Sequence, residues 1–248
     1  MPTLHDRVLA ARTRIDDAAR TAGRDPSEVR LLLATKTQDV ATVLEAVLAT
    51  TEIAADRGDD GAALIGENRV QELVAKAPDL ADLVAAGRLE VHMIGNLQRN
   101  KINQMLPTVT GLASIDRLPL AEAVAQRCTR AGRVLDVMVQ VNVSAESSKS
   151  GASPSDATAL ATAVSALDGL HLTGFMTIGA NTSDEAEVRA GFARLREVRD
   201  EVLASGAPGT SDARELSMGM STDLELAVAE GATTVRVGTA VFGERPAA

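Results

Sequence analysis

Short apolar runs alternate with amphipathic stretches along almost the whole chain. The first amphipathic stretch predicts an opening helix, with Leu4, Val8, Ala11, Ile15 and Ala18 at helical spacing. Strand-like runs then fall near residues 30–36, 62–66, 89–95, 111–115, 134–142, 170–177, 213–218 and 233–238. Helical stretches follow them near residues 39–50, 67–77, 97–106, 117–130, 154–167, 184–204 and 221–230. Predicted strands and helices therefore alternate regularly.

This alternation predicts an α/β protein, a single-domain (β/α)8 TIM barrel over residues 1–248. A doubly wound open sheet is the alternative, because one miscounted strand would change the topology. Ser153 followed by Pro154 predicts a helix start, with a capping hydroxyl and a proline in the first turn. The acidic, glycine-containing segment 50–61 is expected to be a surface loop insertion away from the functional motifs.

The composition disfavours several classes of protein. The net charge of −9 argues against binding to nucleic acids or anionic membranes, and there is no Trp or Tyr on which bases could stack. No apolar run is long enough for a membrane helix, and residues 1–5 lack the pattern of a secretory signal. The single cysteine, Cys128, falls in a helical pattern and is expected to be a packed, inert thiol. We therefore expect a cytoplasmic protein.

Lys36 stands at the polar end of the apolar run formed by residues 31–34. In a barrel it would lie at the carboxyl end of its strand, where barrel enzymes place their chemistry. Strand alternation puts Lys36 on the face of Leu32 and Ala34, so its amine would point into the barrel mouth. Partial desolvation there favours the neutral amine, which is a competent Schiff-base nucleophile. The alternative is a lysine that extends from the strand end into solvent.

Hydroxyl groups and glycines cluster after the last two predicted strands. Ser217, Gly219 and Ser221 lie between the seventh strand and the next helix, where hydroxyls and backbone N–H groups can bind an anion. Gly238 and Thr239 end the eighth strand with a second pair of this kind. Loops after strands seven and eight are the usual phosphate site of this barrel. The sequence therefore predicts a phosphate site there.

Arg236 narrows the ligand class. It lies two residues before Gly238 on the same strand face, so it is expected to point into the barrel beside the phosphate. A lysine nucleophile and a phosphate site at one mouth suit an aldehyde that carries a phosphate, either pyridoxal phosphate or a sugar-phosphate substrate of an aldolase. Arg236 favours pyridoxal phosphate, because a permanently charged arginine keeps the pyridine nitrogen unprotonated.

Other polar residues follow predicted strands at the same level. Asn68, after the second strand, is within reach of the mouth, whereas Glu67 is better explained as a carboxylate near the positive end of the next helix. His92 on the third strand could stack on a ligand ring, although a packed core histidine is the commoner outcome. Lys149 lies in a polar loop and is a second candidate amine or a solvated lysine; we favour the solvated lysine.

A series of motifs resembles the pyridoxal phosphate homeostasis protein family. In chain order they are LLLATKTQ around Lys36, IGENRVQEL, VHMIGNLQRNKIN, SIDR, VQVNVSAESSKSG, GFMTIGA and LSMGMSTDLELAVAEGATTVRVGTAVFG. They cover roughly residues 30 to 243, and the last is long and specific. The resemblance implies a single-domain barrel similar to the N-terminal domain of alanine racemase. It also implies pyridoxal 5'-phosphate bound as an internal aldimine.

The resemblance also implies a role for individual residues. Lys36 would form the aldimine, Arg236 would contact the pyridine nitrogen, and Ser217, Gly238 and Thr239 would hold the phosphate, with Asn68, His92 and Met218 as further contacts of the cofactor. The chain departs from the family pattern at Thr35, where serine usually precedes the lysine. The departures put the contacts that flank the ring in doubt, rather than the lysine or the phosphate groups.

Three activities fit such a site. The first is a carrier that buffers pyridoxal phosphate and supplies it to apoenzymes without efficient catalysis. The second is an amino-acid racemase or decarboxylase, but racemases of this fold use a tyrosine opposite the lysine, and the chain has none. The third is a Schiff-base aldolase, which gives Arg236 no role. We therefore expect a pyridoxal phosphate carrier, a monomer whose partners include pyridoxal phosphate-dependent apoenzymes, with no nucleic acid or membrane partner.

Overall fold

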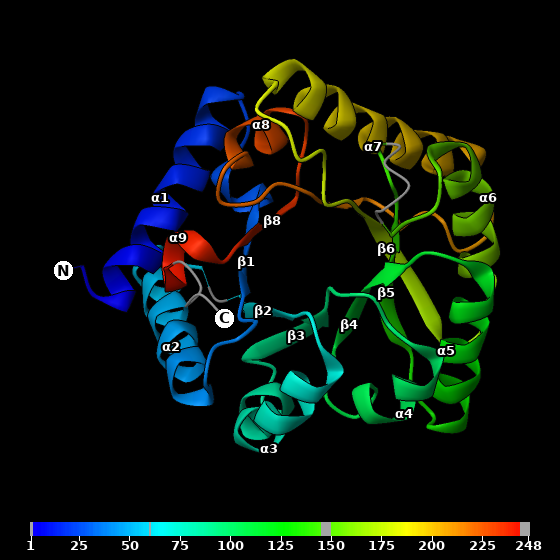
Figure 1. Ribbon diagram of the computed structural model, residues 1–248, viewed down its shortest axis with the longest axis horizontal. Helices are drawn as coiled ribbons and strands as arrows, with labels where there is room; N and C mark the ends of the chain where they lie inside the picture. The colour runs from blue at the N-terminus through cyan, green and yellow to red at the C-terminus, as the bar shows by residue number, and fades with distance from the viewer. Residues whose placement is uncertain (1, 60, 145–149, 244–248) are drawn as a thin grey trace.

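The apolar runs of the sequence form eight parallel strands that close into a barrel (Figure 1). The strands are β1 (Arg30–Ala34), β2 (Ala63–Glu67), β3 (Leu89–Met93), β4 (Gly111–Ile115), β5 (Leu135–Gln140), β6 (Leu170–Met176), β7 (Glu215–Ser217) and β8 (Thr234–Val237). In this computed structural model, which describes residues 2–59, 61–144 and 150–243, β1 pairs with both β2 and β8. The predicted single-domain barrel is therefore confirmed, and the open sheet is excluded.

Helices surround the barrel and connect successive strands (Figure 1). They are α1 (Leu4–Thr21), α2 (Val40–Asp56), α3 (Val70–Ala85), α4 (Ile102–Met105), α5 (Leu118–Arg130), α6 (Pro154–Ser165), α7 (Glu185–Ser205), α8 (Leu224–Ala229) and α9 (Thr239–Phe242), with 3-10 turns at Pro26–Glu28 and Arg99–Lys101. Ser153 caps α6 by accepting from the N–H of Asp156, as predicted. The short α9 was not predicted from the sequence.

The two faces of each strand bury different side chains. Leu31 and Leu33 belong to the large core between the barrel and the helices. Leu32 is equally buried but lies outside that core, because alternation turns it into the barrel. Inside the barrel Met138 and Met176 form a small separate cluster. The carboxyl ends of the strands, here called the mouth, are thus separated from their amino ends, here called the floor, by packed side chains.

The prediction of a loop over residues 50–61 was wrong. Helix α2 continues to Asp56, so only the residues after it connect to β2. Ile53 is buried, and the Thr50 and Thr51 hydroxyls donate to carbonyls one turn back, which accommodates two β-branched residues in the helix. Cys128 is fully buried on α5, and burial raises the pKa of its thiol, as expected for an inert cysteine.

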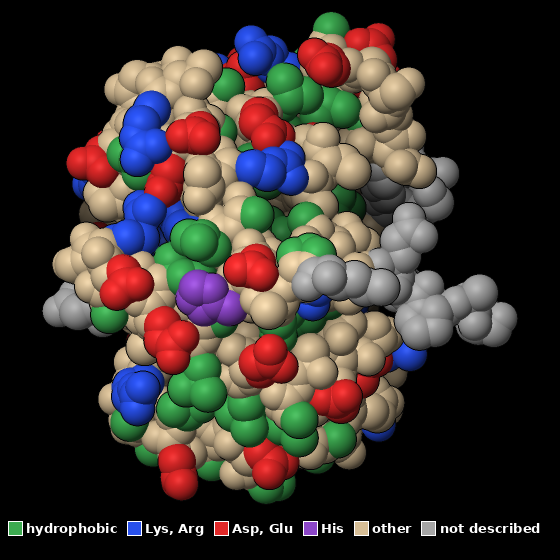
Figure 2. Space-filling view, turned by 90° about the vertical axis from the view of Figure 1, so that its left-hand side faces the viewer, with side chains coloured by type: hydrophobic (Ala, Val, Ile, Leu, Met, Phe, Trp, Pro, Cys, Tyr) green, Lys and Arg blue, Asp and Glu red, His purple; other side chains and the backbone are tan. Residues whose placement is uncertain are grey.

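The surface over α1 and α2 carries acidic and basic side chains in alternation (Figure 2). Two arginines of α1 form ion pairs, Arg14 with Glu225 of α8 at 2.7 Å and Arg20 with Asp17 of α1 at 2.9 Å. A surface with interspersed signs has no broad positive field to attract a polyanion. None of the helices in the described ranges is long and apolar enough to cross a membrane.

Candidate functional site

The mouth contains a turn centred on Lys36. Strand β1 ends at Ala34, so Lys36 lies two residues beyond it rather than in the strand. Its side chain is half-buried, and Thr37 after it has φ +66, a backbone conformation that non-glycine residues seldom adopt. Strand alternation turns Leu32 into the barrel as predicted, but β1 ends at Ala34, before Lys36. Lys36 therefore occupies the predicted end of β1, in a turn.

Arg236 is buried inside the barrel at the mouth. One guanidinium nitrogen donates to the carbonyl and the hydroxyl of Ser217 at 2.7 and 2.9 Å, and the other donates to the carbonyl of Thr177 at 2.6 Å. All three acceptors are neutral, and burial lowers the pKa of Arg236 to about 10, against the opposing charge of Asp223. A buried cation held only by neutral oxygens is suited to an additional electron-rich partner.

Two loops meet beside Arg236, one after β7 and one after β8. The Arg236 N–H donates to the carbonyl of Gly219 at 3.0 Å, and the Ala240 N–H approaches the Ser221 hydroxyl at 3.4 Å. Gly219 has φ +88, and a Cβ atom there would lie 2.5 Å from the Cβ of Ala227, so only glycine fits. The predicted phosphate residues of strands seven and eight are therefore brought together.

Gly238 connects this pair of loops to the Lys36 turn. It precedes Thr239, the first residue of α9, and a Cβ atom built on it would lie 3.4 Å from the carbonyl oxygen of Ala34. The Ser217 hydroxyl accepts from Arg236 and keeps its own proton for a further acceptor. The donors at this mouth, which are hydroxyl groups, the Arg236 guanidinium and the Lys36 amine, suit a phosphorylated aldehyde.

Asn68 lies at the same end of the barrel, directly after β2. It lines a surface cavity of about 630 Å³ together with Arg69, Gln71, Glu72 and Lys101. Glu72 also accepts a hydrogen bond from the N–H of Thr37, so this cavity adjoins the Lys36 turn. Asn68 therefore lies beside a cavity that reaches the Lys36 turn through Glu72, and its contact with a cofactor stays a prediction. Lys149, the second candidate amine, lies outside the described residues.

Two predicted contact residues are not brought to the mouth. The His92 ring points into the barrel toward the floor, where its Nε2 lies 3.6 Å from Glu90 and against Gly111, the first residue of β4. Met218 is fully buried in the outer core with Leu216, and its N–H donates to the carbonyl of Thr234. The His92 ring is too close to the floor to reach the mouth, and strand alternation turns the Met218 side chain outward, toward the helices. The structure argues against both as cofactor contacts.

The interpretation of Glu67 as a helix-end carboxylate was also wrong. Glu67 is the last residue of β2 and is fully buried, with its Oε1 atom 2.6 Å from the Lys76 Nζ atom and 2.7 Å from the Thr35 hydroxyl. One signal was present in the sequence: Lys76 falls on the apolar stripe of α3, in line with Val70 and Leu73. A lysine on such a stripe needs a buried partner.

Comparison with known proteins agrees with this geometry. A sequence model of the alanine racemase N-terminal domain family matches residues 40–246. The structure also resembles that of alanine racemase from Clostridium difficile 630, with a TM-score of 0.68 over 96% of this chain and 58% of that one, at 11% identity. Family match and fold define the class: a barrel of the alanine racemase N-terminal domain type.

Full-length relatives narrow the class. A pyridoxal phosphate homeostasis protein from Pseudomonas aeruginosa is 42% identical over 99% of this chain and 97% of its own length. Another, from Escherichia coli K12, is 37% identical over 96% of this chain and 95% of its own length. The structure of PipY from Synechococcus elongatus, solved with PLP bound, matches with a TM-score of 0.78 and 32% identity over 97% of this chain and all of that one. The chain belongs to the pyridoxal phosphate homeostasis protein family.

Proposed function

We propose that this protein binds pyridoxal 5'-phosphate through a Schiff base with Lys36 and buffers or supplies it inside the cell. The observation that carries the proposal is the meeting of three strand ends: Gly238 after β8 lies against Ala34 of β1, and Ser217 of β7 is bonded to Arg236. A lysine, two loops with hydroxyl groups and glycines, and a buried guanidinium at one mouth support the proposal. Relatives named for pyridoxal phosphate homeostasis support the same reading.

Each residue would have a separate task. The amine of Lys36 would form the covalent bond, while Ser217, Gly238 and Thr239 would bind the phosphate through hydroxyl and backbone donors. Arg236 would face the pyridine nitrogen and keep it unprotonated, which weakens the ring as an electron sink. Burial favours this role, because it makes transfer of a further proton to the neighbouring ring nitrogen costly. The cofactor would then be held with its catalytic power reduced.

Holding the cofactor, rather than catalysis, is the activity we propose. A two-base racemisation needs a second acid–base group opposite the lysine, and this chain contains no tyrosine. Cys128 is not placed to act as this second group, because it is buried on α5 in the outer core, between the barrel and the helices. We infer that the protein acts as a monomeric carrier for pyridoxal phosphate-dependent apoenzymes, in the cytoplasm.

Absorption spectroscopy with two lysine variants tests the proposal. The purified protein with pyridoxal phosphate should show the visible band of a Schiff base, Lys36→Ala should abolish it, and Lys101→Ala should keep it. The loaded protein should restore activity to an apoenzyme that depends on pyridoxal phosphate. A band that persists in Lys36→Ala contradicts the covalent assignment. Rapid exchange of the α-proton of an amino acid would show catalysis and contradict the carrier role.

A further inference from the structure

A buried polar cluster lies behind the Lys36 turn, outside the barrel wall. Its members are Thr35, Glu67 and Lys76, each less than a tenth exposed. The Lys76 Nζ atom donates to the Thr35 carbonyl at 2.9 Å and to Glu67 Oε1 at 2.6 Å. The Thr35 hydroxyl donates to the same carboxylate oxygen at 2.7 Å. Glu67 and Lys76 therefore bind the side chain and the carbonyl of Thr35, the residue directly before Lys36.

A second contact holds the other side of the turn. Glu72, in the first turn of α3, accepts the Thr37 N–H at 2.9 Å. Thr37 has φ +66, a backbone conformation that is strained for a non-glycine residue. Such a conformation persists only where the surroundings enforce it. The backbone is thus held on both sides of Lys36, by the Lys76 ammonium at the Thr35 carbonyl and by the Glu72 carboxylate at the Thr37 N–H.

Stability alone does not explain the cluster. Burying an ion pair costs desolvation, and apolar residues of similar volume are often as stable or more stable. Within the described part of the chain, Glu67 Oε2 is the one buried side-chain oxygen or nitrogen with no hydrogen-bond partner. An unsatisfied buried carboxylate oxygen is a further destabilising feature. A pair with this cost, in contact with the residue directly before Lys36, points to a role in function.

We propose that the Glu67–Lys76 pair, acting through Thr35, is a positioning device that fixes the direction of the Lys36 amine toward its aldehyde. This inference rests on the proposed function. A nucleophile must be held close to the reacting carbon and in line with it, and a misplacement of about 1 Å can slow a reaction by about a hundredfold. Lys36 lies on a turn beyond the end of β1, so the contacts of the turn help to set its position. The cluster provides contacts of this kind at Thr35.

The decisive variant replaces both charges together. Glu67→Leu with Lys76→Met leaves no buried charge unpaired, so the free energy of unfolding should stay close to that of the wild type. The rate of covalent capture of pyridoxal phosphate, followed by stopped-flow absorbance, should fall by about tenfold to a hundredfold. Borohydride reduction and peptide mass spectrometry should show a larger share of the label on Lys101 or Lys149.

Two conservative substitutions at Thr35 test the proposal even if the double variant does not fold. Thr35→Val removes the hydroxyl that donates to Glu67 and should slow capture, whereas Thr35→Ser keeps a hydroxyl and should restore the rate. If wild type labels on Lys36 but both the double variant and Thr35→Val capture at the wild-type rate, the positioning role is overturned and the proposed function stands. If wild type does not label on Lys36, both are overturned.

Discussion

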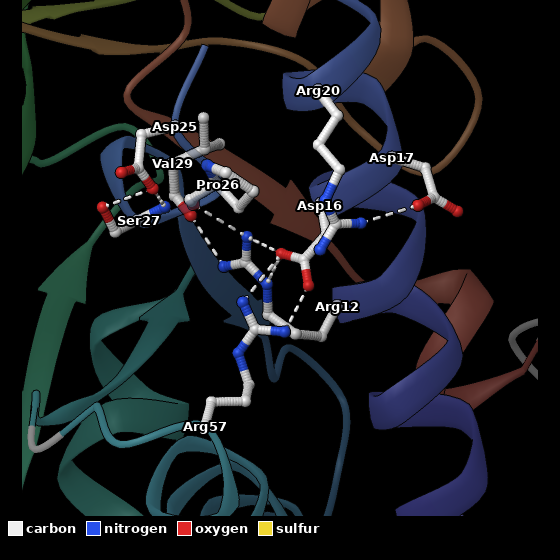
Figure 3. Close-up of polar contacts among 9 residues, drawn as sticks. All are labelled: Arg12, Asp16, Asp17, Arg20, Asp25, Pro26, Ser27, Val29 and Arg57. Carbon is white, nitrogen blue, oxygen red and sulfur yellow. Dashed lines mark hydrogen bonds and ion pairs between the residues drawn. The ribbon is translucent and has the colours of Figure 1, made fainter.

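Two buried charge clusters lie at opposite ends of the barrel, and they are built differently. At the floor, Asp16 of α1 is bound by Arg12 and by Arg57, which follows α2 (Figure 3). Arg12 also donates to the carbonyls of Val29 and Pro26 at 2.7 and 3.1 Å, just before β1. This floor cluster ties α1, the end of α2 and the entry to β1 together. Both oxygens of its carboxylate are hydrogen-bonded.

The mouth cluster of Thr35, Glu67 and Lys76 satisfies its groups less completely. Glu67 has one oxygen without a hydrogen-bond partner, and the cluster links β2 and α3 to the residue directly before Lys36. In this fold the mouth carries chemistry and the floor carries stability. The difference teaches that two buried ion clusters in one molecule can serve different ends. It predicts that floor substitutions change the free energy of unfolding and mouth substitutions change cofactor capture.

The largest expected effect lies at the floor. Asp16→Asn leaves the guanidinium groups of Arg12 and Arg57 close together without a carboxylate, so the free energy of unfolding should fall by about 3–5 kcal/mol. Urea unfolding measures it. In the folded protein the rate of pyridoxal phosphate capture should stay at the wild-type value, so Asp16→Asn is a control that shows the effect of lost stability alone. A capture rate lowered as much as in Glu67→Leu with Lys76→Met would erase the distinction between the clusters.

Substitutions at two glycines, one at the mouth and one far from it, should have effects of intermediate size on stability. Gly219→Ala at the mouth combines a positive φ with a Cβ atom 2.5 Å from Ala227, and should cost about 2–4 kcal/mol and weaken phosphate binding. Gly206→Ala at the end of α7 shares the positive φ, but a Cβ atom there would meet no described atom within 4 Å. It should cost only about 1–2 kcal/mol and leave cofactor affinity unchanged. Thermal unfolding and fluorescence titration measure both. Equal affinity losses in the two variants would contradict the phosphate assignment.

The last prediction is a pH dependence at the floor. Burial favours a higher pKa for Glu90, but contacts with His92 and Arg30 outweigh it and lower the pKa from 4.5 to about 2. A lowered pKa in the folded state adds stability above pH 4.5 that is lost as the pH falls from 4.5 toward 2. Glu90→Gln should therefore be less stable than wild type at pH 7, with the gap closing in that window. Urea midpoints across this range measure it, and a gap that stays constant down to pH 3 would refute the assignment.

The fold was predictable because its signal is local and repeated. Every strand was placed within a few residues, since buried parallel strands appear as short apolar runs separated by helical stretches. The ends of two helices were predicted too early, because these helices continue through residues that disfavour helix formation. Helix α2 continues through Thr50 and Thr51, whose hydroxyls bond back to the helix, and α3 continues through Pro78.

The site was predictable only in part. The common location of Lys36, Arg236 and the residues after β7 and β8 was predicted because the barrel rule says where strand ends meet, and their roles toward a cofactor stay predictions. His92 was misplaced because depth along a strand depends on the stagger of the barrel, which periodicity does not reveal. The Glu67–Lys76 pair was missed because it joins a strand end to a helix nine positions later, through a contact that exists only once the fold has formed.

Mapping the site of covalent attachment tests the central claim most directly. The wild-type protein, loaded with pyridoxal phosphate, reduced with borohydride and digested, should carry one pyridoxyl phosphate group on the peptide that contains Lys36. Free phosphate at high concentration should slow the labelling, because it competes for the loops at Ser217 and Gly238. A label distributed equally over Lys36, Lys101 and Lys149, and insensitive to phosphate, would contradict a built site at the barrel mouth.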